Sequence, residues 1–379
     1  MLKPKIPGCW TPWWTSTAAT IGICLCSLVQ GLAAASRPVV FAQFHGEDVF
    51  AQLDPLEWQA AGIDRLVVRV FRNQSSQGGL FFQNPEFQVV KPLLADLIQR
   101  TRPKHDSIWA WMITRRFDWI GDSRLLDRSF QSGALQVIPS LDLFNPDAMK
   151  RVLAVFGQLA ESGIKGIMIQ DDLVIRSCEG LSSWGRAHYV LKTGNPSEMD
   201  SMLDPRSFAH SRWVDVKTRR VAEVLSQIVG ICKQRNPDIR VGVNVYYETP
   251  LQAKKSREWY AHDLDLLLAT GVDHVFLMAY HRQMAAELGL SAADAAELFS
   301  RMVARAAAKC KDKLVVKIQW RDWQSGEYVP EDELIGLLDR LPEQIHGVCL
   351  TPVALDDLPR LQKLLSRRGW SVGIRQGGG

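Results

Sequence analysis

The chain lacks the short motifs that mark several large enzyme classes. It has no GxGxxG after an expected strand, no GxxxxGK[ST], no GxSxG and no HExxH. Each of these motifs places backbone donors, a serine or metal ligands, so their absence argues against dinucleotide-binding folds, P-loop nucleotidases, α/β-hydrolases and zinc proteases. No cofactor is therefore expected.

Cysteine is scarce outside the first 35 residues, which hold three of the seven. The other four are Cys178, Cys232, Cys310 and Cys349, and none lies in a CxxC pair or in a Cys/His metal-ligand spacing. Cys232 and Cys310 fall in helical patterns and Cys349 in an apolar strand, where buried thiols are usual. We expect no metal site, and nothing in the spacing predicts a disulfide.

Net charge is also small. The formal charge is +4, and residues 1–35 contribute two lysines and no acid, so the remainder carries +4 − 2 = +2. This balance gives no electrostatic reason to expect nucleic acid as a partner.

Residues 1–35 have the pattern of a secretory signal peptide. Lys3 and Lys5 precede an apolar run over 18–32, and Ala33, Ala34 and Ala35 supply the small residues that a signal peptidase prefers. We expect an exported protein, in the periplasm or associated with the outer membrane. The alternative is an uncleaved leader that anchors the chain in a membrane.

From residue 38 onward, short apolar runs alternate with longer segments of helical periodicity, as in βα units with a parallel sheet. Strands are expected over 39–44, 65–71, 107–113, 166–171, 240–247, 274–280, 313–320 and 347–351. Helices are expected over 55–61, 92–100, 147–161, 211–235, 256–270, 292–310, 331–341 and 356–368. Eight strands close a barrel, so the sequence predicts an α/β fold, a single-domain (β/α)8 TIM barrel over 36–375, with a disordered tail at 376–379. Long loops, 118–145 and 173–210, follow the third and fourth strands.

Acidic residues gather at the expected ends of the fourth and fifth strands. The candidates for catalysis are Asp171, Asp172, Glu179 and Glu248. Glycoside hydrolysis needs one carboxylic acid to protonate the leaving oxygen and one carboxylate to act as nucleophile or to activate water. Adjacent charges at Asp171 and Asp172 are expected to raise one pKa. The alternative is that one of these aspartates caps the next segment or pairs with an arginine such as Arg176.

Aromatic and polar residues stand near the same strand ends. Indole and phenol rings stack on sugar C–H faces while their polar edges bind hydroxyls. The expected substrate-binding residues are His45, Trp111, Arg115, Trp184, Tyr246, Tyr280, His281, Gln319, Trp320 and Trp323.

Five ordered stretches carry a family resemblance. GIMIQDD, VYYETP, EWYAHDLDLLLATGVDHVFLMAY, KIQWRDWQSGEYVP and GVCLTP resemble the C-terminal glycoside hydrolase domain of poly-β-1,6-N-acetyl-D-glucosamine deacetylases (PgaB-like). The WAWMI run at 109–113 is similar to that family's third strand. The resemblance implies a barrel that cleaves a partly deacetylated biofilm exopolysaccharide, with catalysis by acids after the fourth strand. By the same resemblance, Glu248 corresponds to the family's acid after the fifth strand, and Gln319 and Trp323 correspond to its glutamine and tryptophan after the seventh.

The family's parent proteins carry an N-terminal metal-dependent deacetylase domain, and the present sequence has no HxxxH pair. Deacetylation is therefore not expected. Our first hypothesis is an exported hydrolase of a β-linked amino-sugar polymer. It is expected to be a monomer, with the polysaccharide as ligand and exopolysaccharide export machinery as a further partner. The second hypothesis is a catalytically silent polysaccharide-binding or export-scaffold barrel, and a third is a hydrolase of another glycan.

Overall fold

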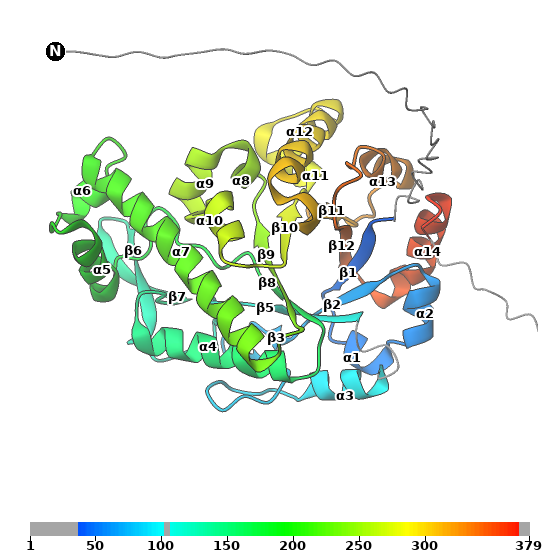
Figure 1. Ribbon diagram of the computed structural model, residues 1–379, viewed down its shortest axis with the longest axis horizontal. Helices are drawn as coiled ribbons and strands as arrows, with labels where there is room; N and C mark the ends of the chain where they lie inside the picture. The colour runs from blue at the N-terminus through cyan, green and yellow to red at the C-terminus, as the bar shows by residue number, and fades with distance from the viewer. Residues whose placement is uncertain (1–36, 102–106, 371–379) are drawn as a thin grey trace, which may run out of the picture. The chain divides into compact units, whose positions relative to one another are not determined.

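Eight parallel strands close into a barrel in the computed structural model, which describes residues 37–101 and 107–370 (Figure 1). They are β1 (Val39–Phe44), β2 (Arg65–Arg69), β5 (Ile108–Met112), β8 (Gly166–Ile169), β9 (Arg240–Val245), β10 (His274–Met278), β11 (Leu314–Gln319) and β12 (Gly347–Val353). The sheet order is β1-β12-β11-β10-β9-β8-β5-β2, so strands adjacent in this series along the chain are also neighbours in the barrel. The predicted (β/α)8 TIM barrel is confirmed. The expected signal peptide at 1–35 and tail at 376–379 lie outside the described residues.

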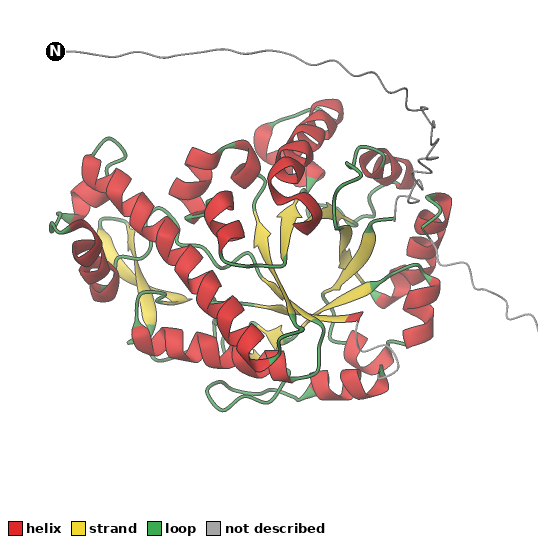
Figure 2. Ribbon diagram, viewed as in Figure 1, coloured by secondary structure: helices red, strands yellow, loops and turns green. Residues whose placement is uncertain are grey.

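Helices surround the strands (Figure 2). Those that match expected segments are α2 (Pro55–Ala60), α3 (Leu93–Arg100), α4 (Pro146–Glu161), α7 (Phe208–Arg235), α12 (Ala292–Cys310), α13 (Glu331–Leu338) and α14 (Leu358–Arg367). The single helix expected over 256–270 is wrong. It is divided into α9 (Ala253–Tyr260) and α10 (Leu264–Ala269), since Ala261 has a left-handed φ of 58° and ends α9. No described helix combines the length and apolar character needed to cross a membrane.

Short elements fill the loops at the carboxyl ends of the strands. They are α1 (Val49–Gln52), β3 (Phe71–Arg72), β4 (Gly79–Leu80), α5 (Ser183–Thr193), α6 (Met199–Leu203), α8 (Glu248–Leu251), α11 (His281–Leu288) and a 3-10 turn at Leu355–Asp357. A second 3-10 turn, Lys311–Lys313, joins α12 to the amino end of β11. The loop over 118–145 contains an antiparallel hairpin of β6 (Leu126–Gln131) and β7 (Ala134–Leu141). Figure 1 shows this hairpin together with α5 and α6 at one end of the molecule, opposite α14.

A separate apolar cluster fills the inside of the barrel. Its members are Phe41, Val67, Trp109, Met168, Phe276, Val315 and Cys349, all buried. Glycine makes room for the large rings, because a Cβ on Gly166 would lie 2.3 Å from the Trp109 indole and one on Gly242 would lie 2.4 Å from the Phe276 ring. The barrel interior at this level is therefore a packed core rather than a channel.

Replacing Gly166 by Ala is expected to destabilise the chain by about 1–3 kcal/mol, because the added methyl overlaps Trp109 in a packed interior. The free energy of unfolding in urea measures this. Gly230→Ala in α7 is the matched control, since its added Cβ meets nothing within 4 Å and helix propensity favours Ala by about 0.5–1 kcal/mol. Equal stability of the two variants would contradict this packing.

Candidate active site

The inward-facing side chains of the barrel change from apolar to polar toward the carboxyl ends of the strands. Alternate residues of a strand share a face, so the positions two residues after the seven cluster members, and after Gly242 on β9, also face the axis. One lies on or next to each strand: Gln43, Arg69, Trp111, Gln170, Asn244, Met278, Lys317 and Thr351. This polar layer forms the floor of the barrel mouth, the face at which TIM-barrel enzymes carry their active sites.

Several polar atoms of the mouth have no hydrogen-bond partner among the described residues. They are Gln43 Oε1, Arg69 Nε, Trp111 Nε1, Gln170 Oε1 and Gln319 Nε2. Buried polar atoms are normally paired in folded proteins. A ligand rich in hydroxyl and amide groups is suited to supply the missing partners.

Asp171 stands at the exit of β8, half-buried, and is held by a tyrosine. The Tyr246 hydroxyl donates to Asp171 Oδ2 at 3.2 Å and also lies 3.1 Å from the Asp171 backbone oxygen. Tyr246 follows β9, the strand next to β8 in the barrel. The carboxylate is therefore positioned by a neighbouring strand while one side remains open.

Glu248 is a buried carboxyl at the start of α8, just after β9. The Tyr260 hydroxyl donates to Glu248 Oε1 at 3.3 Å, whereas Oε2 has no partner among the described residues. Burial raises the pKa of Glu248 and the charge of Glu287 adds to this rise, while its own backbone amide and the hydrogen bond from Tyr260 oppose it. The rise favours the protonated form that a general acid needs.

The two tyrosines that hold these carboxyls are themselves stacked. The ring centroids of Tyr246 and Tyr260 are 4.1 Å apart, with 16° between their planes. The pair thus connects Asp171 on one side with Glu248 on the other. One carboxyl with a raised pKa and a second, more open carboxylate are the groups that glycoside hydrolysis requires.

His45 and Lys317 also belong to the mouth. His45 Nε2 lies 3.2 Å from Thr351 Oγ1, and its ring centroid is 4.7 Å from that of Trp111. Burial, with the positive charges of Lys317 and Arg69, lowers the pKa of His45 to about 3. The imidazole is therefore neutral and can donate a hydrogen bond to a sugar hydroxyl or accept one from it.

Lys317 lies inside the barrel, where its Nζ donates to Asn244 Oδ1 at 3.0 Å. Burial lowers the pKa of this lysine, although the negative charge of Asp171 favours its protonated form. Among residues 37–101 and 107–370, no group of three or more His, Cys, Asp or Glu side chains is arranged to hold a metal ion. The chemistry on this face belongs to carboxyl, phenol, imidazole and amine groups.

A cavity of about 380 Å³ opens beside β10 and β11. Tyr280, Gln319 and Trp323 line it, together with Arg282, Gln283, Ala286, Glu287, Asp322 and Gln324. Trp323 is 41% exposed, and its ring meets that of Tyr280 edge to face at 5.5 Å. An open indole among amide and acid groups is a suitable surface for a pyranose ring.

The family model for hypothetical glycosyl hydrolase family 13 matches residues 62–348, more than half of the 379-residue chain. The chain belongs to this glycosyl hydrolase family. No curated protein sequence matches it. The matched segment includes β2 through β11, so it spans both carboxyls and the polar layer around them.

Solved structures with the same fold include known hydrolases. The glycoside hydrolase domain of PgaB (BpsB) from Bordetella bronchiseptica has a TM-score of 0.71 at 19% identity, over 87% of this chain and 99% of that chain. Two β-galactosidases are also similar in fold. The one from the psychrophilic Marinomonas ef1 has a TM-score of 0.57 at 11% identity, over 83% of this chain and 54% of that chain. The one from Rahnella sp. R3 has a TM-score of 0.55 at 12% identity, over 88% of this chain and 57% of that chain. The resemblance to the PgaB-like hydrolase domain is confirmed.

In this member of hypothetical glycosyl hydrolase family 13, Asp172 does not face the mouth as predicted. It is buried, and its carboxylate accepts hydrogen bonds of 2.8–2.9 Å from the backbone amides of Thr114, Arg115 and Arg116. Burial raises the pKa of Asp172, while these three donors act in the opposite direction. Asp172 fixes the loop after β5, an earlier segment of the chain, so it neither caps the segment that follows it nor pairs with Arg176, and its carboxylate is turned away from the mouth where catalysis was predicted.

Glu179 and Arg115 are also removed from the mouth. Buried Arg115 bonds to Glu179 Oε2 at 2.9 Å and to Asp127 Oδ2 at 2.6 Å. Burial by itself would raise the pKa of Glu179, but Arg115 and Arg176 outweigh it and lower that pKa. The predictions that Glu179 acts in catalysis and that Arg115 binds substrate are corrected. The Arg115 and Glu179 side chains together hold the insertions after β5 and β8 in place.

Three further predicted substrate contacts lie elsewhere. Trp320 is 1% exposed in the core between the barrel and its helices, because Gln319 takes the inward position and the next residue faces outward. His281 is buried, and its Nε2 contacts Glu333 Oε1 at 2.5 Å. Trp184 is exposed, but it lines a different cavity.

The sequence prediction missed several residues of the mouth. Lys317 and Asn244 interrupt the apolar strands LVVKIQ and RVGVNV, and this break was a readable signal for inward polar groups. Arg69 ends β2 in the same way. Tyr260 offered no such signal, because only the folded return of α9 brings it to Glu248.

Proposed function

We propose that this glycoside hydrolase cleaves a β-linked amino-sugar exopolysaccharide of the partly deacetylated poly-β-1,6-N-acetylglucosamine type. The observation that carries the proposal is the carboxyl pair Asp171 and Glu248, held by stacked Tyr246 and Tyr260 at two neighbouring strand ends. Similarity in fold to the PgaB (BpsB) hydrolase domain supports the choice of polymer.

In the proposed mechanism Glu248 is the general acid. Its raised pKa favours the protonated form, which can donate to the leaving glycosidic oxygen. Asp171 supplies the second carboxylate, as nucleophile or as the base that activates water. Tyr246 orients that carboxylate through its hydroxyl. Positioning both groups before the substrate arrives lowers the entropy lost on reaching the transition state.

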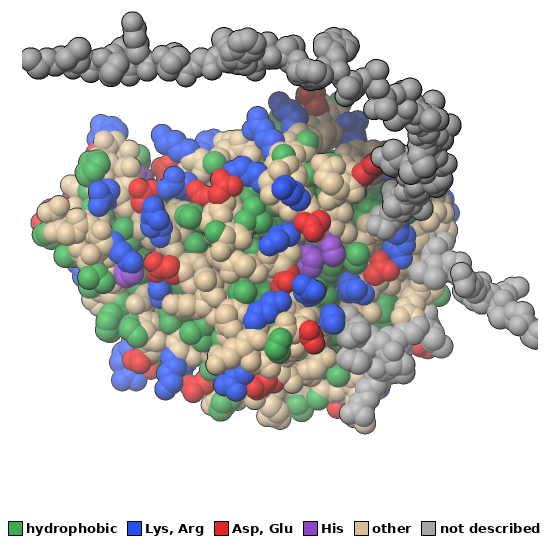
Figure 3. Space-filling view, viewed as in Figure 1, with side chains coloured by type: hydrophobic (Ala, Val, Ile, Leu, Met, Phe, Trp, Pro, Cys, Tyr) green, Lys and Arg blue, Asp and Glu red, His purple; other side chains and the backbone are tan. Residues whose placement is uncertain are grey.

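The cavity beside Trp323 gives a reason for an amino sugar. Glu287 lines it and is hydrogen-bonded to two neutral groups, the Tyr247 hydroxyl at 3.0 Å and the Gln283 amide at 2.7 Å. A carboxylate with neutral partners keeps its charge available for the ammonium group of a deacetylated unit. Basic and acidic side chains are interspersed on the face of the molecule that Figure 3 shows.

Export of a monomer, by the leader at 1–35, is part of the same proposal. Incubation with partly deacetylated poly-β-1,6-N-acetylglucosamine tests it, with a β-1,4-linked chitin oligomer as the control. We expect new reducing ends from the first polymer and fewer from the second. Binding without new reducing ends would reject hydrolysis and favour the silent polysaccharide-binding barrel.

The pH dependence of kcat/KM is expected to respond to the neighbours of Glu248 with opposite signs. Tyr260→Phe removes a hydrogen bond that favours the ionised carboxyl, so the pKa of Glu248 rises. The acid then stays protonated to higher pH, and the alkaline limb of the profile moves to higher pH. Glu287→Gln removes a like charge, so the pKa of Glu248 falls and the alkaline limb moves to lower pH. Full pH–rate profiles measure both. Movement of the limb in the same direction in both variants would contradict Glu248 as the acid.

A further inference from the structure

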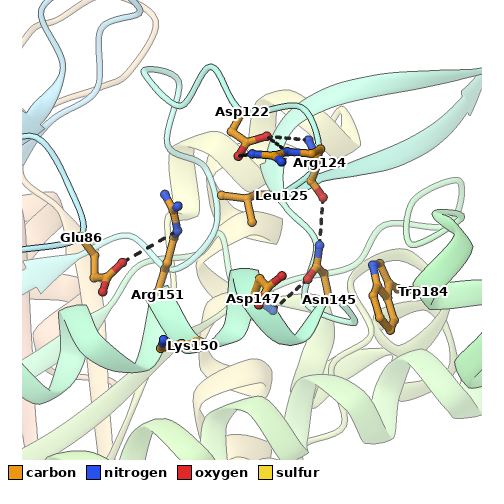
Figure 4. A pocket seen from close by; sticks show the side chains of 9 residues that line it. All are labelled: Glu86, Asp122, Arg124, Leu125, Asn145, Asp147, Lys150, Arg151 and Trp184. Atoms are coloured by element: carbon orange, nitrogen blue, oxygen red, sulfur yellow. Dashed lines mark hydrogen bonds and ion pairs between the residues drawn. The ribbon is translucent and has the colours of Figure 1, made fainter.

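A second cavity, of about 360 Å³, lies outside the mouth (Figure 4). It shares no lining residue with the cavity beside Trp323. Its walls come from the loop after β4, the loop before β6 and the first turns of α4 and α5. Figure 4 shows Trp184 at one end of this cavity and Glu86 at the other.

The cavity opens on the same side of the barrel as the mouth. Helix α4 returns the chain to the start of β8, so its first turn lies at the side where strands end. The loop after β4 and helix α5 likewise belong to connections that leave strand ends before their helices turn back. A polymer bound in the mouth can therefore continue toward the second cavity.

Charges in the cavity wall balance one another. Asp122 is paired with Arg124 through two contacts of 2.9 Å, and Glu86 lies 4.0 Å from Arg151. Asp147 and Lys150 are exposed and make no ion pair within 4 Å of another described residue. Three acids and three bases leave no net charge, so the wall favours a neutral ligand with many hydrogen-bonding groups over an ion.

Trp184 supplies an open aromatic face. Its side chain is 48% exposed and contacts no other aromatic ring among the described residues. The start of α5 is held firmly, because Ser182 Oγ accepts from the Gly185 amide at 3.0 Å and donates to Asp142 Oδ2 at 2.6 Å. The backbone that carries the indole is thus held in place, which reduces the entropy lost when a sugar ring stacks on it.

We propose that this cavity is a second polysaccharide-binding site, which holds neutral N-acetylated units of the polymer away from the reaction centre. The inference rests on the proposed function, because the ligand is the polymer that the mouth cleaves. Trp184 stacks on a pyranose face, and Asp147 and Lys150 bind its hydroxyl and amide groups. The site increases the time that a long chain stays bound without adding a catalytic group.

Affinity electrophoresis in a gel containing poly-β-1,6-N-acetylglucosamine tests the site, with Asp171→Asn as the background so that the polymer stays intact. Adding Trp184→Ala is expected to weaken retardation roughly two- to tenfold, the range for loss of one aromatic stacking contact. Trp184→Phe should restore part of the loss. Leu191→Ala is the matched control, since Leu191 lies on the same helix, is 78% exposed and does not line the cavity.

Equal retardation of the Trp184→Ala and Leu191→Ala proteins would overturn the second site while leaving hydrolysis untouched. The wild-type chain is assayed in parallel for new reducing ends. Their absence, together with no retardation of any variant, would reject the proposed function and the second site with it. Weaker retardation in Trp184→Ala alone supports the site.

Discussion

Replacing Glu248 by Gln, or Asp171 by Asn, is expected to lower kcat on the polymer by roughly 10²–10⁴-fold, the usual contribution of a positioned acid or base. Neither change alters side-chain volume, and neither carboxyl makes an ion pair within 4 Å of another described residue. The thermal unfolding temperature should therefore stay close to that of the wild-type chain. Release of reducing ends under single-turnover conditions measures the effect.

Asp172→Asn is the matched control, because it makes the same chemical change one residue away. An amide at this position keeps one oxygen but loses the charge that accepts from Thr114, Arg115 and Arg116. We expect a lower unfolding temperature and a smaller loss of kcat than in Asp171→Asn. The opposite order, with Asp171→Asn active and Asp172→Asn folded but inactive, would exchange the roles of the two aspartates.

Replacing Arg115 by Met is expected to reduce the free energy of unfolding by about 3–5 kcal/mol, because it leaves buried carboxylates without their cation. Burial already raises the pKa of Asp127 despite Arg115, and the negative charges of Asp142 and Glu179 contribute to this. Denaturant unfolding at neutral pH measures the loss.

Arg116→Met is the control for this change. Arg116 is the next residue and is exposed, so its replacement should alter stability by less than about 0.5 kcal/mol. At lower pH, the free energies of unfolding of Arg115→Met and the wild-type chain should differ less, since protonation removes the charge of the unpaired carboxyls. A similar small effect in both variants would show that the buried ion pairs do not stabilise the insertions.

Most of the barrel could be predicted because its signal is local. Each strand is a mainly apolar run, and each long helix has its own periodicity and stop, so β1 and α12 have the predicted bounds. The hairpin of β6 and β7 was read as a loop, although Ser132 and Gly133 stand between two strands and both have positive φ (52° and 82°), as a type I′ turn requires.

The site was harder to predict, because the direction of a side chain after a strand end is set by distant segments. Asp171 and Asp172 are adjacent and chemically alike. Only the backbone amides of the loop after β5, which bind Asp172, decide that Asp171 is the one left at the mouth. Arg115, Asp127 and Glu179 meet because two insertions pack together. Trp320 is different, since alternation along β11 already indicated that Gln319 and Trp320 face opposite sides.

The most direct measurement of the roles of Asp171 and Glu248 uses a β-1,6-linked N-acetylglucosamine oligomer with a 2,4-dinitrophenyl leaving group. This group departs without a proton, so Glu248→Gln should release it in the first turnover at close to the wild-type rate while remaining slow on the polymer. Asp171→Asn should be slow on both substrates. Equal losses of Glu248→Gln on the two substrates, or wild-type rates in both variants, would contradict the assignment of this carboxyl pair.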